Sequence, residues 1–116
     1  MNIQNMDKAT MNGEVHSLED IVKYIPNAIL QTPLLKKTTG EIQLIAYDVG
    51  EDLARSISPF DNFLMLLEGS AIITLQNKEK HIKAIQCIII PAHSSCSIKA
   101  VERFKMLSVI IKSGYE

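Results

Sequence analysis

Short stretches with strand-forming composition recur from residue 28 to residue 111, and each ends at a turn. Stretches of roughly four to eight residues at such regular spacing are typical of a β-sandwich or a closed barrel, not of a parallel α/β sheet. Pro33 places the first stretch at a sheet edge, because proline cannot donate a hydrogen bond to a neighbouring strand. The sequence therefore predicts an all-β fold of about eight or nine strands, with candidates at Ala28–Leu35, Glu41–Tyr47, Phe63–Leu67, Ser70–Gln76, Lys80–Lys83, Cys87–Ile90, Cys96–Ala100 and Phe104–Ile111.

The region before these strands has a different pattern. Ser17 precedes Leu18, Ile21 and Val22, which share one face of a helix, and an acidic residue stands three positions after the serine. These features resemble a capping box and predict one or two helical turns. The helix should end before Pro26, because the residue before a proline disfavours helical backbone. We therefore predict one short N-terminal helix.

A chain of 116 residues forms one domain. Residues 1–14 are polar and lack periodicity, so we expect a flexible arm there and a barrel domain over residues 15–116. The net charge of −1, with both signs interspersed, offers no basic surface for nucleic acid or for an anionic membrane. Two cysteines without a secretory signal, and no apolar run near the ~20 residues that span a bilayer, predict a cytoplasmic location.

Local patterns add predictions for individual segments. Asp48–Ala54 is polar and reads as a loop, and Asn77–Lys78 is expected at the tip of a hairpin, where asparagine tolerates left-handed backbone. Cys87 precedes an apolar strand and is predicted to be a small buried hydrophobe. Met65 and Met106 lie in strands and are predicted to fill the core.

Two of the predicted strands are apolar on both faces. Ile88–Ile90 and Met106–Ile111 leave little room for a solvent-exposed side. A sheet with one wet face would show alternation, so these runs indicate that the outer face is covered as well. The cover is either the N-terminal arm or a second subunit. We favour a homodimer, because a small barrel has few elements to spare for its own exterior.

The spacing from residue 50 onward resembles the first motif of the cupins, which are small barrels of the double-stranded β-helix, or jelly-roll, type. In that family a glycine is followed by five residues, His-x-His, three or four residues, a glutamate, six residues and a second glycine. Gly50 and Gly69 stand at the two glycine positions here. Ser56 and Ser58 replace the histidines, and Asn62 replaces the glutamate.

The second cupin motif, which runs from a glycine through Pro-x-Gly and a histidine to an asparagine, is matched in the same way. Pro91 is kept, and Cys96 stands at the histidine position. Ile85, His93 and Ala100 replace the outer glycine, the inner glycine and the asparagine. The segment PAHSSCSIKAVERFKML also resembles small bacterial cupins, so the resemblance covers residues 18–112 and implies the cupin fold.

The resemblance does not extend to the metal chemistry of the family. Cupin metal sites use three histidines and a carboxylate to hold iron, manganese, nickel or zinc. Hydroxyl and amide groups are weak neutral ligands for those ions. Because all four ligand positions have changed here, we predict neither a metal nor another cofactor, and the metal-dependent reactions of the family are not carried over.

The most direct functional prediction is a metal-free barrel that binds a small organic ligand. Neutral polar groups would orient the ligand and apolar groups would line the pocket, at Ser56, Ser58, Asn62 and Cys96 and at Leu64, Ile98 and Met106 respectively. Two enzyme alternatives are a metal-dependent cupin with relocated ligands and a thiol catalyst that uses Cys96, with His93 nearby in sequence. A third alternative is an interaction protein with a plugged barrel, so whether the chain is an enzyme stays open.

Overall fold

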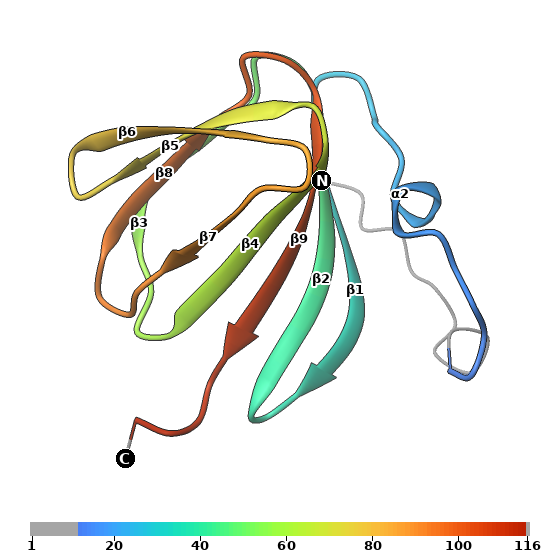
Figure 1. The fold of residues 1–116 in the computed structure, drawn as a ribbon, viewed down its shortest axis with the longest axis horizontal. Coiled ribbons are helices and arrows are strands. Elements are labelled where there is room, and N and C mark those ends of the chain that lie inside the picture. Colours follow the sequence, from blue (N-terminus) through green and yellow to red (C-terminus); the bar gives the residue numbers. More distant parts are fainter. Residues whose placement is uncertain (1–11, 116) are drawn as a thin grey trace.

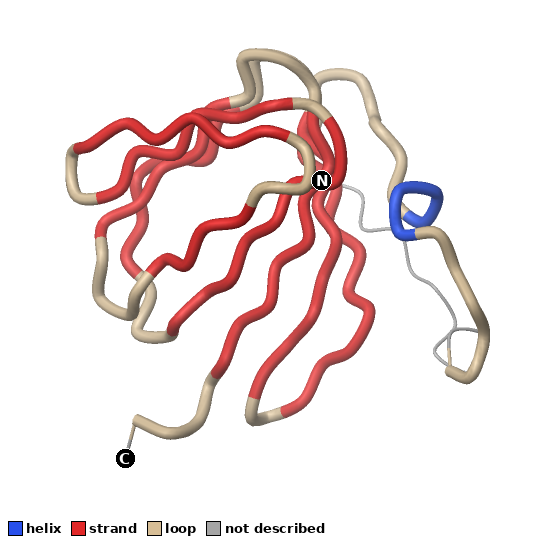
Figure 2. The backbone as a smooth tube through the Cα atoms, viewed as in Figure 1, coloured by secondary structure: helices blue, strands red, loops and turns tan. Residues whose placement is uncertain are grey.

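The computed structural model describes residues 12–115 and shows nine strands and one short helix in this part of the chain (Figures 1 and 2). The helix α2 (Leu18–Ile21) is a single turn that precedes all the strands. The strands are β1 (Ile29–Lys37), β2 (Gly40–Tyr47), β3 (Asp52–Ile57), β4 (Asp61–Glu68), β5 (Ser70–Leu75), β6 (Lys78–Lys83), β7 (Cys87–Ile90), β8 (Ser95–Lys99) and β9 (Phe104–Ile111). All eight predicted stretches are strands, with small differences at their ends.

The strands form two antiparallel sheets that face each other (Figure 1). One sheet has the order β1-β2-β9-β4-β7 and the other has the order β3-β8-β5-β6. Strand β1 lies at the edge of the first sheet, with a bulge between Pro33 and Leu35, as the proline predicts. The arrangement confirms the predicted all-β double-stranded β-helix with one short helix.

The space between the sheets holds the main hydrophobic core. Alternate residues of each strand point inward, since successive side chains of a strand lie on opposite faces. Tyr47 and Phe104 stack with their ring centroids 4.5 Å apart, and both rings are almost fully buried. Leu66, Ile73 and Met106 complete the packing, so Met106 fills the core as predicted.

A second core lies on the outer face of the five-stranded sheet, beneath α2. Ile21 and Val22 pack there against Leu30, Leu44 and Ala46. Figure 1 shows α2 outside the barrel. The segment around α2 therefore covers one part of the outer face, including Leu107 from one of the apolar runs, whereas the sequence predicted the N-terminal arm or a second subunit as the cover. We refer to the surface of Leu30, Leu44 and Ala46 as the covered half.

Tyr24 fastens this segment to the barrel. Its hydroxyl donates a hydrogen bond to Glu68 Oε2 at 2.8 Å. The Arg103 guanidinium lies 3.9 Å from the ring centroid, which is within the range of a cation–π contact, and Lys105 lies on the same ring at 5.1 Å. Burial, followed by the hydrogen bond to Glu68, raises the pKa of Tyr24.

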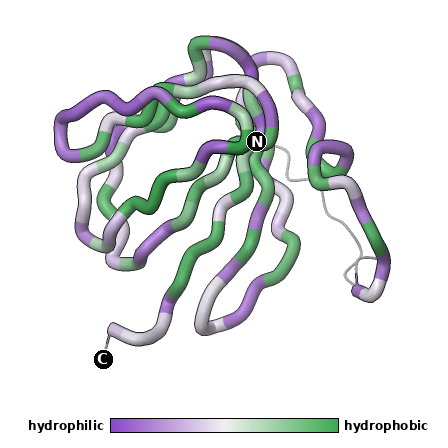
Figure 3. The backbone as a smooth tube through the Cα atoms, viewed as in Figure 1, coloured by the Kyte–Doolittle hydropathy of each residue, from purple (hydrophilic) through white to green (hydrophobic). Residues whose placement is uncertain are grey.

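No other segment of residues 12–115 packs over the rest of the outer face as the segment around α2 does. The pairings Leu35–Ile42, Ile42–Val109, Val109–Phe63 and Phe63–Ile89 place these five side chains in one row across all five strands. We call Leu35, Ile42, Val109, Phe63 and Ile89 the outer row. None of them belongs to either core cluster, and Leu35 and Ile89 are exposed. Figure 3 shows the apolar character of β7 and of the later part of β9.

The backbone at the motif positions keeps the left-handed conformation that glycine favours. Gly50 and Gly69 have φ angles of 83° and 80°. Ile85 and His93, which stand where the resemblance places the other two glycines, have φ angles of 67° and 66°. A left-handed conformation is unfavourable for residues with a Cβ, and most of all for a β-branched one. The backbone at Ile85 and His93 is therefore left-handed although neither residue is a glycine.

Three local predictions were wrong. The polar stretch Asp48–Ala54 is not all loop, because β3 begins at Asp52; this edge strand is exposed along its whole length and so lacks an apolar signal. Cys87 is exposed, because it occupies an outward position on the uncovered part of the sheet. Ser17 is the N-cap residue of α2, but its side chain makes no capping hydrogen bond.

Smaller differences concern a turn, a methionine and the chain terminus. The hairpin tip is Gln76–Asn77, since Leu75 pairs with Lys78 and both tip residues have positive φ angles. Met65 is half-buried on the outer face and belongs to neither core. The predicted arm lies mostly outside the described residues. Within the described range no helix has the length and hydropathy needed to cross a bilayer.

Candidate functional site

A small cavity opens between the two sheets at one end of the barrel. Its volume is about 80 Å³. Strand β3 faces it from one sheet through Ser56, which pairs with Cys96 of β8, while β4 and β7 face it from the other through the pair Asn62 and Ile90. Ten residues line it, none of them charged: Leu53, Ser56, Ser58, Phe60, Asn62, Leu64, Ile90, Ser94, Cys96 and Ile98.

The structure brings together six of the seven residues singled out in the sequence. Four of these are the polar residues at the former ligand positions, and the other two are apolar: Ser56, Ser58, Asn62, Cys96, Leu64 and Ile98. Met106 lies in the same core cluster as Leu64 but does not line the cavity. The convergence follows from the fold, because the two motifs lie on strands that meet at this end of the barrel.

A hydrogen bond from the core orients Asn62. The hydroxyl of Ser108, which is almost fully buried, donates to Asn62 Oδ1 at 2.9 Å. The amide oxygen therefore faces Ser108. The amide NH₂ group, which bonds to no described residue, is left as a donor at the cavity. Ser108 thus acts as a positioning residue for the lining amide.

Hydrogen bonds also join the two loops that form the rim. The amide of His93 donates to the carbonyl oxygen of Ser58 at 2.7 Å. The amide of Ala92 donates to Asp61 Oδ1 at 2.8 Å. The Ser58 hydroxyl accepts from the amide of Phe60 at 3.1 Å and so is partly engaged by the rim itself. Ser56, Ser94 and the amide of Asn62 are the more available polar groups.

Cys96 has the environment of an unreactive thiol. It is 8% exposed, and its only described hydrogen bond is a long contact from Sγ to the carbonyl oxygen of Ser97. Burial raises the pKa of the Cys96 thiol, whereas a reactive cysteine needs a lowered pKa. His93 is exposed and does not line the cavity, so it is not placed as a base for the thiol.

The donor set at the former ligand positions does not fit a transition metal. Two hydroxyls, a neutral amide and a protonated thiol supply no imidazole and no carboxylate. Across residues 12–115 there is also no cluster of three or more His, Cys, Asp or Glu side chains that could hold an ion. A relocated metal site is therefore without support in the described part of the chain.

Four lining residues were not singled out in the sequence: Leu53, Phe60, Ile90 and Ser94. Ile90 belongs to a run that is apolar on both faces, so alternation gave no indication of its inward position. Leu53 lies on β3, which was expected to be a loop. Phe60 and Ser94 lie in the spacer positions of the two motifs, which the motifs leave unspecified. Only the position of Ser94, two residues before Cys96 in the second motif, could have suggested it.

Comparisons with known proteins agree with this architecture. No protein-family model and no curated protein matches the chain. Among solved structures, a conserved protein of unknown function from Streptococcus pyogenes is 27% identical, with a TM-score of 0.85 over 98% of this chain and 96% of that one. A cupin superfamily protein from Desulfitobacterium hafniense is 22% identical, with a TM-score of 0.83 over 88% of this chain and 94% of that one.

The protein is a small cupin-fold domain. A cupin 2 conserved barrel domain protein from Leptotrichia buccalis is also similar, at 23% identity and a TM-score of 0.78. The match covers 81% of this chain but 46% of that protein, so this cupin barrel corresponds to one part of the longer chain. These similarities show the fold and leave the activity unassigned.

Proposed function

We propose that this cupin barrel binds a small, neutral, oxygen-bearing organic molecule at its mouth, without a metal. The observation that carries the proposal is the lining itself, which combines three serines, an oriented amide and a buried thiol with apolar walls. A pocket with a few convergent polar groups in an apolar setting is the usual form of a small-molecule site.

The chemistry of the lining narrows the ligand class. The free NH₂ group of Asn62 donates to an acceptor such as a carbonyl or hydroxyl oxygen, and the hydroxyls of Ser56 and Ser94 add donors or acceptors. A charged ligand group would lose hydration without gaining a counter-charge, since no lining residue is charged. The site therefore favours neutral amides, ketones and alcohols over carboxylates and amines.

The size of the cavity limits the part of the ligand that enters. A volume of about 80 Å³ lies well below the ~300 Å³ lower bound of pockets for drug-sized ligands. The cavity accommodates a few heavy atoms, which corresponds to a very small molecule or to the end group of a larger one. The Tyr47–Phe104 stack fills part of the interior between the sheets.

Ligand-observed NMR with matched sets of small neutral and charged probes tests this proposal. Neutral amides and ketones are expected to bind, and carboxylates of the same size are not. Ser56→Ala removes one lining hydroxyl and should weaken binding by about fivefold, which corresponds to ~1 kcal/mol. Ser97→Ala, on an outward position of β8, is the matched control and should leave binding unchanged.

A variant with a larger expected effect on binding replaces the side-chain amide of Asn62. Asn62→Leu keeps the side-chain size and removes the donor, so probe binding should be lost while the protein stays folded by circular dichroism. Stoichiometric iron, zinc or manganese in protein purified without chelators would contradict the metal-free site. Fast alkylation of Cys96, at a rate similar to that of the exposed Cys87, would favour the thiol alternative instead.

The small volume also favours a second candidate, an interaction protein whose barrel is closed by its own side chains. In that case no probe binds, and filling the cavity by Ser56→Val raises the melting temperature without any functional loss. The Ser56→Val variant and the probe-binding experiment thus distinguish the two candidate functions.

A further inference from the structure

We propose that residues 112–115, which follow β9, form a strap that holds the mouth of the barrel closed, and that Tyr115 is the positioning residue that fastens this strap. The inference is carried by hydrogen bonds and ring contacts that join the segment to the rim of the cavity. Only its consequence for ligand exchange rests on the proposed function, so the strap itself can be tested without a ligand.

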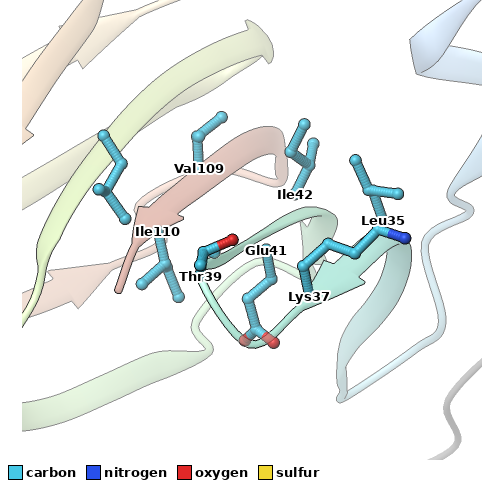
Figure 4. A pocket seen from close by; sticks show the side chains of 9 residues that line it. Leu35, Lys37, Thr39, Glu41, Ile42, Val109 and Ile110 are labelled. Carbon is cyan, nitrogen blue, oxygen red and sulfur yellow. The ribbon is translucent and has the colours of Figure 1, made fainter. Parts of the chain in front are cut away.

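The first residue of the strap is anchored on the β1–β2 hairpin. The amide of Lys112 donates to the carbonyl oxygen of Thr39 at 2.8 Å, and Lys112 Nζ lies 3.4 Å from Glu41 Oε2. Figure 4 shows that Glu41 points to the side of the sheet opposite to Ile42 and Val109, which border a groove of about 230 Å³ on the outer face. Lys112 is therefore held toward the inner side of the sheet, where the mouth lies.

Tyr115 fastens the other end of the strap to the rim. Its hydroxyl accepts a hydrogen bond from the amide of Asp61 at 2.6 Å and donates one to the carbonyl oxygen of Ile111 at 2.8 Å. The carboxylate of Asp61 in turn accepts from the amide of Ala92, which lies in the loop between β7 and β8. One tyrosine hydroxyl thus links the end of β9 to the start of β4, and through Asp61 to the opposite loop of the rim.

Phe60 connects the strap to the cavity. It lines the cavity, and its ring centroid lies 5.9 Å from that of Tyr115 in a tilted arrangement. Lys112 Nζ lies 6.0 Å from the same centroid. Tilted aromatic pairs at such a distance attract each other, and a cation near the ring face adds a weaker attraction. Because both ends of the strap contact Phe60, release of the strap frees this part of the cavity wall.

The strap is suited to opening while the barrel stays folded. None of residues 112–115 belongs to either core cluster, and Tyr115 is exposed. The hydrogen bonds of Tyr115 and the ion pair of Lys112 are interactions of small net free energy, because water competes for them. Segments held in this way open at a lower free energy than the whole domain unfolds. The strap therefore sets how often the mouth opens, and with it the rate at which a bound molecule enters and leaves.

The two cysteines supply a test that needs no ligand. Cys96 lines the cavity and is buried, whereas Cys87 is exposed on the outer face. Iodoacetamide therefore reaches Cys96 only when the mouth opens or the chain unfolds. Tyr115→Phe keeps the ring and removes the hydroxyl, so the alkylation rate of Cys96, measured by mass spectrometry, should rise about fivefold. Tyr115→Ala also removes the ring contact and should raise the rate about 30-fold. Cys87 should react at the wild-type rate in both variants.

Tyr24→Phe is the matched control. It removes a tyrosine hydroxyl that bonds to Glu68, at the opposite end of β4 from Asn62 and the mouth. A general loss of stability would raise the alkylation rate of Cys96 in this variant as well, whereas opening of the mouth would not. Circular dichroism confirms that each variant is folded. An increase in Tyr115→Phe that does not exceed the increase in Tyr24→Phe, or a wild-type rate in Tyr115→Ala, would overturn the proposal.

A neutral probe separates this inference from the proposed function. Acetamide bound at the mouth should protect Cys96 from alkylation, and Tyr115→Phe should raise its dissociation rate about fivefold, measured by exchange broadening of the probe signal. An equal dissociation rate in the two proteins would contradict control of ligand exchange by the strap. If no probe binds to the wild-type protein, the proposed ligand site is wrong, and the alkylation rates of Cys96 still decide whether the strap holds the mouth closed.

Discussion

The covered half and the outer row belong to the same face of the same sheet, yet they have different environments. Leu44 and Ile42 lie two residues apart on β2 and point to the same side. Leu44 is fully buried under α2, whereas Ile42 borders the open groove. The strand pattern is apolar in both places, so burial on this face depends on which segment lies above it. One turn of helix and its flanking residues make the difference.

The largest expected effect is on the free energy of unfolding, when Leu44 and Ile42 are each replaced by alanine. Leu44→Ala should lower the free energy of unfolding by about 3 kcal/mol, because it removes a fully buried side chain and leaves a cavity. Ile42→Ala should lower it less, by about 2 kcal/mol, because Ile42 is half-buried and borders the open groove. Chemical denaturation of the two variants beside the wild-type protein measures both losses. Equal losses would show that the outer row is buried in the single chain.

A second prediction concerns Tyr24, whose contacts join the covering segment to the barrel. Tyr24→Phe removes the hydroxyl that donates to Glu68 and keeps the ring beneath Arg103. The free energy of unfolding should fall by about 1.5 kcal/mol, the lower end of the range for a hydrogen bond to a charged group, because the Glu68 side chain is partly exposed. Phe60→Leu, an aromatic change far from α2, is a control for general packing loss. Hydrogen exchange of residues near Leu30 and Leu44 should increase in Tyr24→Phe but not in the control.

A third prediction concerns a substitution that should stabilise the covered half. Thr32 is fully buried there, and its hydroxyl has no hydrogen-bond partner among the described residues. Thr32→Val keeps the shape and removes the unpaired group, so the free energy of unfolding should rise by about 1 kcal/mol. Thr74→Val, on a half-buried position of β5, should change it much less. A loss of stability in Thr32→Val would indicate that water satisfies the hydroxyl.

The smallest expected effect is on the pH dependence of stability. It concerns Asp48, at the point where the covering segment joins the barrel. The backbone amide of Asn27 donates to Asp48 Oδ2 at 2.7 Å. Hydrogen bonds from the amides of Asn27 and Val49 hold the pKa of Asp48 below its usual value. A lowered folded-state pKa stabilises the protein above the unfolded pKa, and the benefit is lost as the pH falls through the folded value.

Asp48→Asn should therefore reduce the loss of melting temperature between neutral pH and about pH 3. Asp52→Asn, on exposed strand β3, is the control and should retain the wild-type profile. An unchanged profile in Asp48→Asn would mean that this contact does not contribute to acid sensitivity.

Much of the fold was predictable because it follows from local chemistry. Strand-forming stretches and turn residues predicted eight of the nine strands, and Pro33 predicted the edge position of β1. The missing strand, β3, is exposed along its length and pairs only with β8. Its strand conformation depends on backbone pairing with β8, which is distant in sequence. Its own composition therefore does not predict a strand. Cys87 was misplaced for a related reason, since its exposure depends on what covers the outer face.

The candidate site was likewise predicted only in part. Motif spacing predicted four of the lining residues, and Leu64 and Ile98 were predicted as apolar lining from the strands beside them. The spacing could not reveal that Ser108 orients Asn62, nor that the cavity measures only about 80 Å³. Both depend on how side chains from β4, β8 and β9 fill the shared space.

The sequence alone determined eight of the nine described strands, most of the turns and the neutral side chains at the cupin ligand positions, because backbone preference and donor chemistry belong to individual residues. The left-handed turns at Ile85 and His93 show how firmly the spacing specifies the path even where glycine is gone. Tertiary structure alone decided which apolar faces are buried among the described residues and how large the mouth is. Burial is a relation between segments distant in the chain, and the same strand supplies Leu44 to a core and Ile42 to the surface.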